Sequence, residues 1–174
     1  MKSTQTTTWL LTGQKDAGKT TWLSSLILRL REQGAYFFGV LSPKFFRDGE
    51  LLGIEVVDLA TDHRAILAEA APKGTPHRWF FSNEGIALGN AACDPSTHRG
   101  LCIVDEIGPL EIEGGGFSTA WTMMQKGSYE RVLAVVRPSL IDTVRPLLPE
   151  HTKIIRFSDE LSASEVITDI NLPT

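Results

Sequence analysis

A glycine-rich stretch near the start of the sequence contains residue types that suit it to hold phosphate. Gly13 and Gly18 are separated by four residues, and Lys19 and Thr20 follow directly. Glycines let a backbone curl so that successive N–H groups point at an anion, with no Cβ in the way. A lysine at this spacing neutralises β- and γ-phosphate charge, and the threonine hydroxyl is a Mg²⁺ ligand. The spacing therefore predicts a phosphate-binding loop.

The predicted nucleotide-binding residues form one continuous segment, and Lys19 is also predicted to act in catalysis. They are Gly13, Gln14, Lys15, Asp16, Ala17, Gly18, Lys19, Thr20 and Thr21. We expect the side chains of Lys15 and Asp16 to be solvated. The alternative is a glycine-rich turn between a strand and a helix that binds nothing.

Two acidic residues after a buried run could hold a metal and activate water. Residues 101–104 are all apolar, as expected of a central parallel strand, and Asp105 and Glu106 follow them. Ligands of open α/β sheets bind beyond the carboxyl ends of the strands, so both carboxylates are expected near Lys19 and Thr20. We predict that Asp105 and Thr20 bind Mg²⁺, and that Glu106 polarises the water attacking the γ-phosphate. The alternative is an ordinary acidic turn after a strand.

The phosphate loop needs a strand before it and a helix after it. Residues 7–12 are apolar and rich in β-formers, and apolar residues then recur at helical spacing as far as Gly34. Strands are predicted near 7–12, 37–43, 52–59, 101–105, 131–136 and 152–157. Helices are predicted near 18–33, 83–92, 117–126, 138–147 and 160–169. This alternation is typical of an α/β fold.

Length and composition limit the possible classes of protein. The 174 residues suggest one domain, 1–174, with a substantial core. A net charge of −4 makes a nucleic-acid partner an unfavoured hypothesis, because such proteins present a strongly basic face. We expect no membrane segment, since the apolar runs are short, and no signal peptide. Two cysteines fit a reducing cytosol, so a cytoplasmic location is predicted.

Two motifs together resemble a known family. GQKDAGKTT at 13–21 and DEIGPLE at 105–111 are similar to motifs of the small nucleoside-triphosphatases first described from thermophiles, which have a cancer-related human member. Residues 39–60 look like the β-hairpin of that family, 80–90 like its next helix, and 131–139 like a later strand.

The resemblance implies both a fold and an activity. It implies slow hydrolysis of ATP, GTP and other nucleoside triphosphates with little base selectivity. Pro109 and Leu110 depart from the lysine and methionine of the family signature. The hairpin motif is matched only by Leu51, Gly53 and Ile54.

The sequence as a whole predicts a P-loop NTPase. The expected fold is a three-layer α/β sandwich with a mainly parallel, RecA-like central sheet and a β-hairpin after the first helix. The expected activity is Mg²⁺-dependent hydrolysis of a nucleoside triphosphate, with any protein partner left open. Two alternatives remain, a small-molecule phosphotransferase and a nucleotide-binding accessory protein for cofactor insertion. Segment 108–130, where a kinase lid would lie, has only Lys126 as a basic residue.

Some charged residues near the predicted site have no assigned role. Arg137 ends an apolar run, and Lys44 and Arg47 lie around a hairpin turn. Each could approach the phosphates, but we favour solvated side chains. We predict a mobile loop at 68–78, from its prolines, glycine and polar residues.

Overall fold

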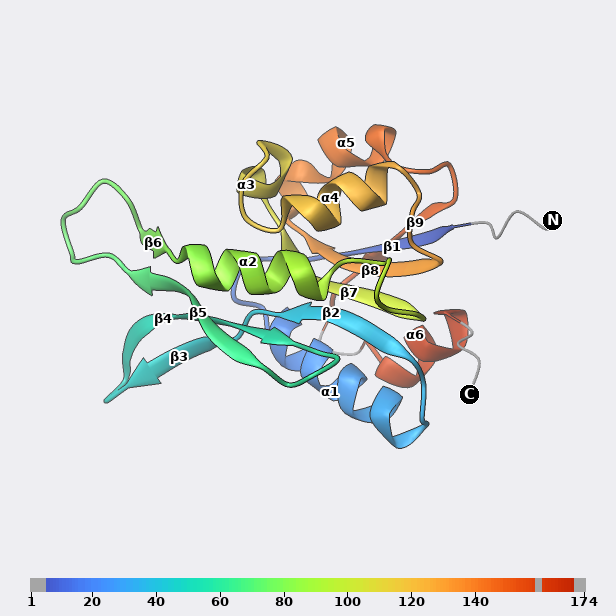
Figure 1. Ribbon diagram of the computed structural model, residues 1–174, viewed down its shortest axis with the longest axis horizontal. Helices are drawn as coiled ribbons and strands as arrows, with labels where there is room; N and C mark the ends of the chain where they lie inside the picture. Colours follow the sequence, from blue (N-terminus) through green and yellow to red (C-terminus); the bar gives the residue numbers. More distant parts are fainter. Residues whose placement is uncertain (1–5, 159–160, 171–174) are drawn as a thin grey trace.

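The computed structural model describes residues 6–158 and 161–170, which form one nine-stranded sheet flanked by helices (Figure 1). The strand order is β6-β5-β4-β2-β7-β8-β1-β9, and β3 pairs with β4. The strands are β1 Thr7–Thr12, β2 Phe37–Leu41, β3 Lys44–Arg47, β4 Glu50–Asp58, β5 Arg64–Ala70, β6 Trp79–Phe81, β7 Leu101–Ile107, β8 Arg131–Val136 and β9 Thr152–Arg156.

Helices cover both faces of the sheet, as Figure 1 shows. One face carries α1 (Lys19–Glu32) and α6 (Ala163–Ile170). The other carries α2 (Asn83–Ala92), α3 (Pro109–Ile112), α4 (Ser118–Gln125) and α5 (Ile141–Val144). None of the helices among the described residues is long and apolar enough to cross a membrane.

Two hydrophobic cores, one on each face, hold these layers together. Strand side chains alternate between faces, so Cys102 and Val104 of β7 pack into one core, and Leu101 and Ile103 pack into the other. The helices pack on the two faces accordingly: the buried side chains of α1 and α6 belong to the second core. This arrangement confirms the predicted three-layer α/β sandwich.

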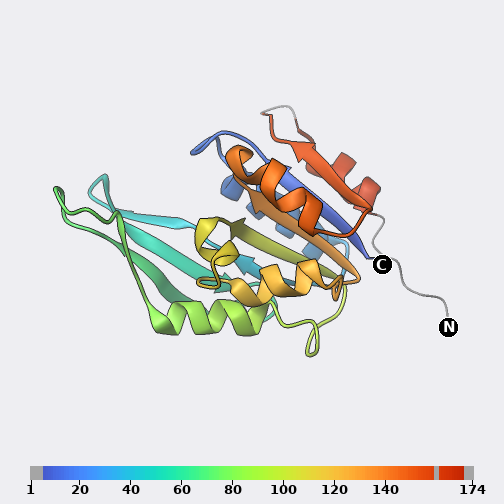
Figure 2. The same ribbon diagram turned by 90° about the horizontal axis from the view of Figure 1, so that it is seen from above.

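The strands around the phosphate loop are parallel. β2, β7, β8, β1 and β9 pair in parallel, so their carboxyl ends share one edge of the sheet. The remaining strands, β3 to β6, extend this part in antiparallel fashion, and β3 and β4 form the expected hairpin after α1. In Figure 2 the antiparallel strands project beyond the carboxyl-terminal edge of the parallel strands, on the side of the phosphate loop.

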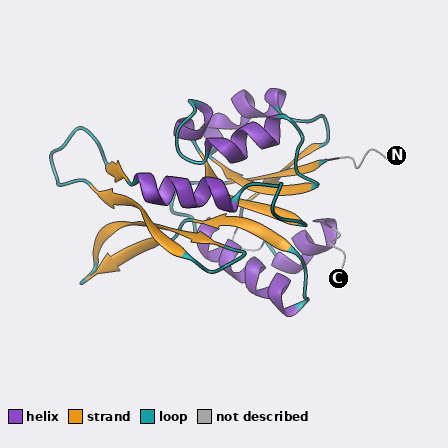
Figure 3. Cartoon of the chain, in the orientation of Figure 1, coloured by secondary structure: helices purple, strands orange, loops and turns teal. Residues whose placement is uncertain are grey.

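Several predicted elements differ from the structure (Figure 3). β5 and β6 were not expected; they flank residues 71–78, which form neither helix nor strand and lie within the predicted loop. The helix predicted at 138–147 is broken into α5 and two short 3₁₀ helices, Pro138–Leu140 and Arg145–Leu147, because prolines interrupt its hydrogen bonding. The last helix begins at Ala163, and residues 159–160, included in that prediction, lie outside the described residues.

Candidate phosphate-binding site

The phosphate loop joins β1 to α1, and its two glycines are required for different reasons. Gly18 has a φ of 97°, a conformation that residues with a side chain rarely adopt, and its carbonyl accepts from the Trp22 N–H. At Gly13 a Cβ atom would lie 2.8 Å from the Cβ of Phe157. The first glycine thus allows a close approach of two segments, and the second turns the chain into the helix.

The side chain of Lys19 lies back along the phosphate loop. Its Nζ donates to the carbonyl oxygens of Gly13, at 2.8 Å, and Gln14, at 2.5 Å. An ammonium group carries three protons, so a third donor remains for an anion placed over the loop. Residues Gln14 to Gly18 are exposed, which leaves the loop accessible to a ligand.

Asp105 and Thr20 meet at the carboxyl end of β7. Thr20 Oγ1 donates to Asp105 Oδ2 at 2.9 Å, and the Ser42 N–H donates to the same oxygen at 3.2 Å. The predicted proximity of these two distant residues is therefore observed. The peptide bond between Asp105 and Glu106 is cis.

Burial controls the ionisation of Asp105, which is 4% exposed. Loss of hydration raises the pKa of this carboxyl to about 6 in spite of its hydrogen bonds from Ser42 and Thr20. The nearby charge of Glu106 adds to the rise, and Lys19 opposes it. An ionised Asp105 is thus a buried anion whose charge is only partly offset by its neighbours, which favours a cation beside it.

Glu106 lies next to Arg137, a cation that we had expected from the sequence to be solvated. Arg137, at the end of β8, donates from Nε to Glu106 Oε1 at 2.9 Å. A Cβ atom on Gly108 would lie 3.8 Å from both Arg137 Nη2 and Glu106 Oε1, so the ion pair lies close to this glycine. The expectation for Arg137 was thus incomplete: its side chain is 56% exposed but paired.

The β3–β4 hairpin is tied to the phosphate loop by an ion pair. Lys44 Nζ, at the start of β3, bonds to Asp16 Oδ1. This hydrogen bond lowers the pKa of Asp16, and the charges of Lys15 and Arg78 act in the same direction. Both side chains were expected to be merely solvated. They instead connect the projecting hairpin to the phosphate loop.

Glu111 has a structural part in the site that sequence reasoning did not assign. Its carboxylate is buried and accepts from the backbone N–H of Gly108 at 2.8 Å and of Phe117 at 3.2 Å. Burial raises the pKa of Glu111. This carboxylate closes the turn that follows Glu106. A glycine, a proline at the first helical position and a glutamate two residues later form a recognisable capping pattern that would have predicted it.

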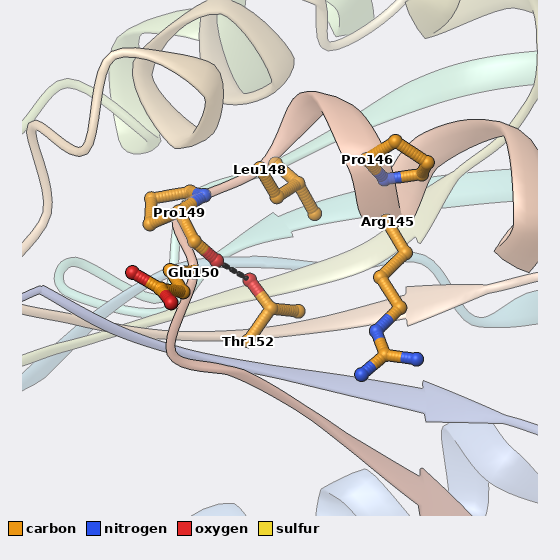
Figure 4. Close-up of a pocket in the computed structure, with 6 residues that line it drawn as sticks. All are labelled: Arg145, Pro146, Leu148, Pro149, Glu150 and Thr152. Carbon is orange, nitrogen blue, oxygen red and sulfur yellow. Dashed lines mark hydrogen bonds between the residues drawn. The ribbon is translucent and has the colours of Figure 1, made fainter.

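A surface pocket of about 480 Å³ lies away from these residues. Figure 4 shows its lining side chains, with the Thr152 hydroxyl donating to the Pro149 carbonyl at 2.7 Å. Thr152 begins β9 and pairs with Thr8, so the pocket is at the amino-terminal end of the parallel strands. The pocket and the phosphate loop therefore lie at opposite ends of the parallel strands.

These features together define a P-loop nucleotide-binding protein. They are the glycine loop between β1 and α1, the lysine and threonine at the start of the helix, and the aspartate at the end of buried β7. A family model described as NTPase matches residues 8–160 of this chain. The chain belongs to the NTPase family, and it is an enzyme of the nucleoside-triphosphatase class.

Individual relatives agree with this assignment. The nucleoside-triphosphatase THEP1 of Methanopyrus kandleri is 26% identical over 162 residues, covering 92% of this chain and 90% of the relative. The protein of the same name from Thermococcus kodakarensis is 29% identical over 173 residues, covering 91% of each. The solution structure of a human cancer-related nucleoside triphosphatase matches with a TM-score of 0.69 and 17% identity, covering 95% of this chain and 97% of that one. The family resemblance of the two sequence motifs is thereby confirmed.

Proposed function

We propose that this site hydrolyses nucleoside triphosphates to nucleoside diphosphate and phosphate, with Mg²⁺ as cofactor. The observation that carries the proposal is the 2.9 Å hydrogen bond between Thr20 and Asp105. It joins the helix of the phosphate loop to the acidic end of β7, which supports a common site for the proposed phosphate-binding and metal-binding residues. The names of the relatives, nucleoside-triphosphatases, support hydrolysis as the reaction.

Thr20 and Asp105 would hold the Mg²⁺ ion. Both offer oxygen ligands, which a hard cation prefers, and Mg²⁺ normally takes only one or two ligands from protein and the rest from phosphates and water. The incompletely offset charge of buried Asp105 fits a neighbouring cation. When bound, the ion would neutralise charge that develops on the phosphate oxygens.

The remaining residues act on phosphate and water. The backbone of Gly13–Thr21 would cradle the phosphates, and Lys19 would neutralise the β- and γ-phosphates by exchanging its bonds to loop carbonyls for phosphate oxygens. Glu106 would accept a proton from the attacking water, and Arg137 would hold its carboxylate in place. The family resemblance supports ATP, GTP and other triphosphates as substrates with little base selectivity.

The chain would act as a single domain, 1–174, in the cytoplasm. Its cysteines, Cys93 and Cys102, are free and buried, which fits a reducing compartment.

Phosphate release tests the proposed function. Purified chain is incubated with each of the four nucleoside triphosphates, with Mg²⁺ or with a chelator. We expect release from all four that depends on Mg²⁺ and is lost in Lys19→Ala. Transfer to a small-molecule acceptor in place of release to water would instead identify a phosphotransferase. Turnover only with an added protein would indicate an accessory role.

A further inference from the structure

Ser42, whose backbone N–H binds Asp105, has a buried hydroxyl with no hydrogen-bond partner in the part of the chain that the structure describes. Three side-chain oxygens share this condition among the described residues, namely Thr8 Oγ1, Thr12 Oγ1 and Ser42 Oγ. Buried polar atoms are nearly always paired in folded proteins, and an exception often marks a functional site. Ser42 therefore needs an explanation other than stability.

The chain leaving β2 carries Ser42 to Asp105. β2 pairs in parallel with β7, with Val40 beside Val104, so the residues that follow these two run side by side. The Ser42 N–H donates to Asp105 Oδ2 at 3.2 Å, the oxygen that also accepts from Thr20 Oγ1. The backbone of Ser42 thus fixes its position next to both proposed metal ligands, while its buried hydroxyl has no partner among the described residues.

We propose that Ser42 is a positioning residue whose hydroxyl binds a water in the hydration shell of the metal, jointly with Asp105. This rests on the proposed function, which assigns Mg²⁺ to Thr20 and Asp105. A bound Mg²⁺ keeps several waters, and each has two protons that need acceptors. A serine hydroxyl accepts one of them and adds no charge beside Asp105, whereas a third carboxylate would repel it.

Thr8 provides a matched control because it has the same unpaired hydroxyl at a different place. It lies at the start of β1, paired with Val132 and Thr152, whereas the phosphate loop follows the other end of that strand. Removal of either hydroxyl takes away an unsatisfied polar atom. The two substitutions should therefore affect folding alike and the metal site differently.

The test compares Ser42→Ala and Thr8→Val with the wild-type chain in two measurements. The first is the thermal midpoint in metal-free buffer without nucleotide, where both variants should equal or exceed the wild type. The second is binding of a non-hydrolysable triphosphate analogue, titrated with Mg²⁺ and repeated with chelator. Ser42→Ala should need about tenfold more Mg²⁺ for half-maximal binding, the usual effect of losing a residue that supports a metal site. Thr8→Val should match the wild type, and Ser42→Thr should restore the affinity.

Two outcomes would overturn the inference. An unchanged Mg²⁺ requirement in Ser42→Ala would mean that the hydroxyl contacts no water of the metal. A lower thermal midpoint of that variant would mean that the hydroxyl stabilises the fold. The two readouts are analogue binding and thermal unfolding, so they decide the role of Ser42 without any measurement of hydrolysis. If the wild-type chain releases no phosphate, that result contradicts the proposed hydrolysis but not the role of Ser42.

Discussion

Arg137 Nε lies 2.9 Å from Glu106 Oε1, so the end of β8 presents a cation to the carboxylate at the end of β7. The strands are neighbours in the sheet, and their paired carboxyl ends bring two residues that are 31 positions apart into one ion pair. An exposed ion pair adds little to stability. Its consequence here is orientation, because it restricts the carboxylate that we propose as the base.

Arg137→Ala should therefore slow turnover through Glu106. We expect a decrease of about 10-fold, since misplacement of a catalytic group is costly while its chemistry is retained. The affinity for a non-hydrolysable triphosphate should change little. The double variant with Glu106→Gln should be no slower than Glu106→Gln alone, because the two residues act as a unit. Steady-state phosphate release measures all three variants. If the rate loss of the double variant equals the product of the two single losses, Arg137 acts independently of Glu106.

Lys19→Ala should abolish tight triphosphate binding, because the β- and γ-phosphates lose their main counter-charge. Lys15→Ala is the matched control, since it removes the same charge from an exposed position on the same loop. Its effect on affinity should stay below about tenfold, as expected for a solvated charge. Calorimetric titration measures both variants. Wild-type affinity in Lys19→Ala would exclude this loop as the binding site.

Asp105→Asn should stabilise the nucleotide-free chain while it impairs function. The folded-state pKa of Asp105 is raised from 3.8 to about 6, so ionisation costs stability as pH rises between these values. The asparagine variant avoids this loss and should gain about 3 kcal/mol at pH 7.5, and roughly half of that at pH 5. Both hydrogen bonds from Thr20 and Ser42 can be kept by the amide oxygen.

Denaturant unfolding of Asp105→Asn in metal-free buffer at these two pH values measures the gain. The same variant should need more Mg²⁺ and turn over more slowly. A stability difference independent of pH would contradict the buried, ionisable state of Asp105. Normal turnover at low Mg²⁺ would place the metal ligand elsewhere in the chain.

Glu111→Gln should destabilise the turn after Glu106. One carboxylate oxygen becomes an NH₂ group that faces the N–H of either Gly108 or Phe117, so one buried hydrogen bond is lost. The expected cost is about 1–3 kcal/mol in the free energy of unfolding. Glu113→Gln, an exposed change at the end of α3, is the control and should be neutral. Equal stability of both variants would mean that the carboxylate does not hold this turn.

Local patterns account for the part of the fold that the sequence predicts. β1, α1 and the phosphate loop follow from spacing, and α2 has the predicted bounds, 83–92, with Ser82 as its cap. β5 and β6 were missed because three of the seven residues of β5 are alanines, which have low strand propensity, and β6 has only three residues. Their strand conformation depends on pairing with β4 and with each other.

The candidate site likewise contains residues that the sequence predicts and contacts that it does not. Lys19 and Thr20 are neighbours in sequence, and Asp105 is recognisable at the end of an apolar run. The contacts of Asp105 with Ser42 and of Glu106 with Arg137 depend on β2 and β8 lying on either side of β7. Strand order is a property of the whole fold, so residue spacing does not reveal these partners.

The most direct test of hydrolysis at this site is Glu106→Gln, measured for both binding and single-turnover phosphate release. Glutamine keeps the shape of the side chain but cannot accept a proton from water. Phosphate release should fall ~100-fold or more, the range for loss of a general base, while Mg²⁺-dependent triphosphate binding stays close to that of the wild type. The variant would then retain bound substrate. Equal losses of binding and release, or no loss of either, would contradict Glu106 as the residue that activates water.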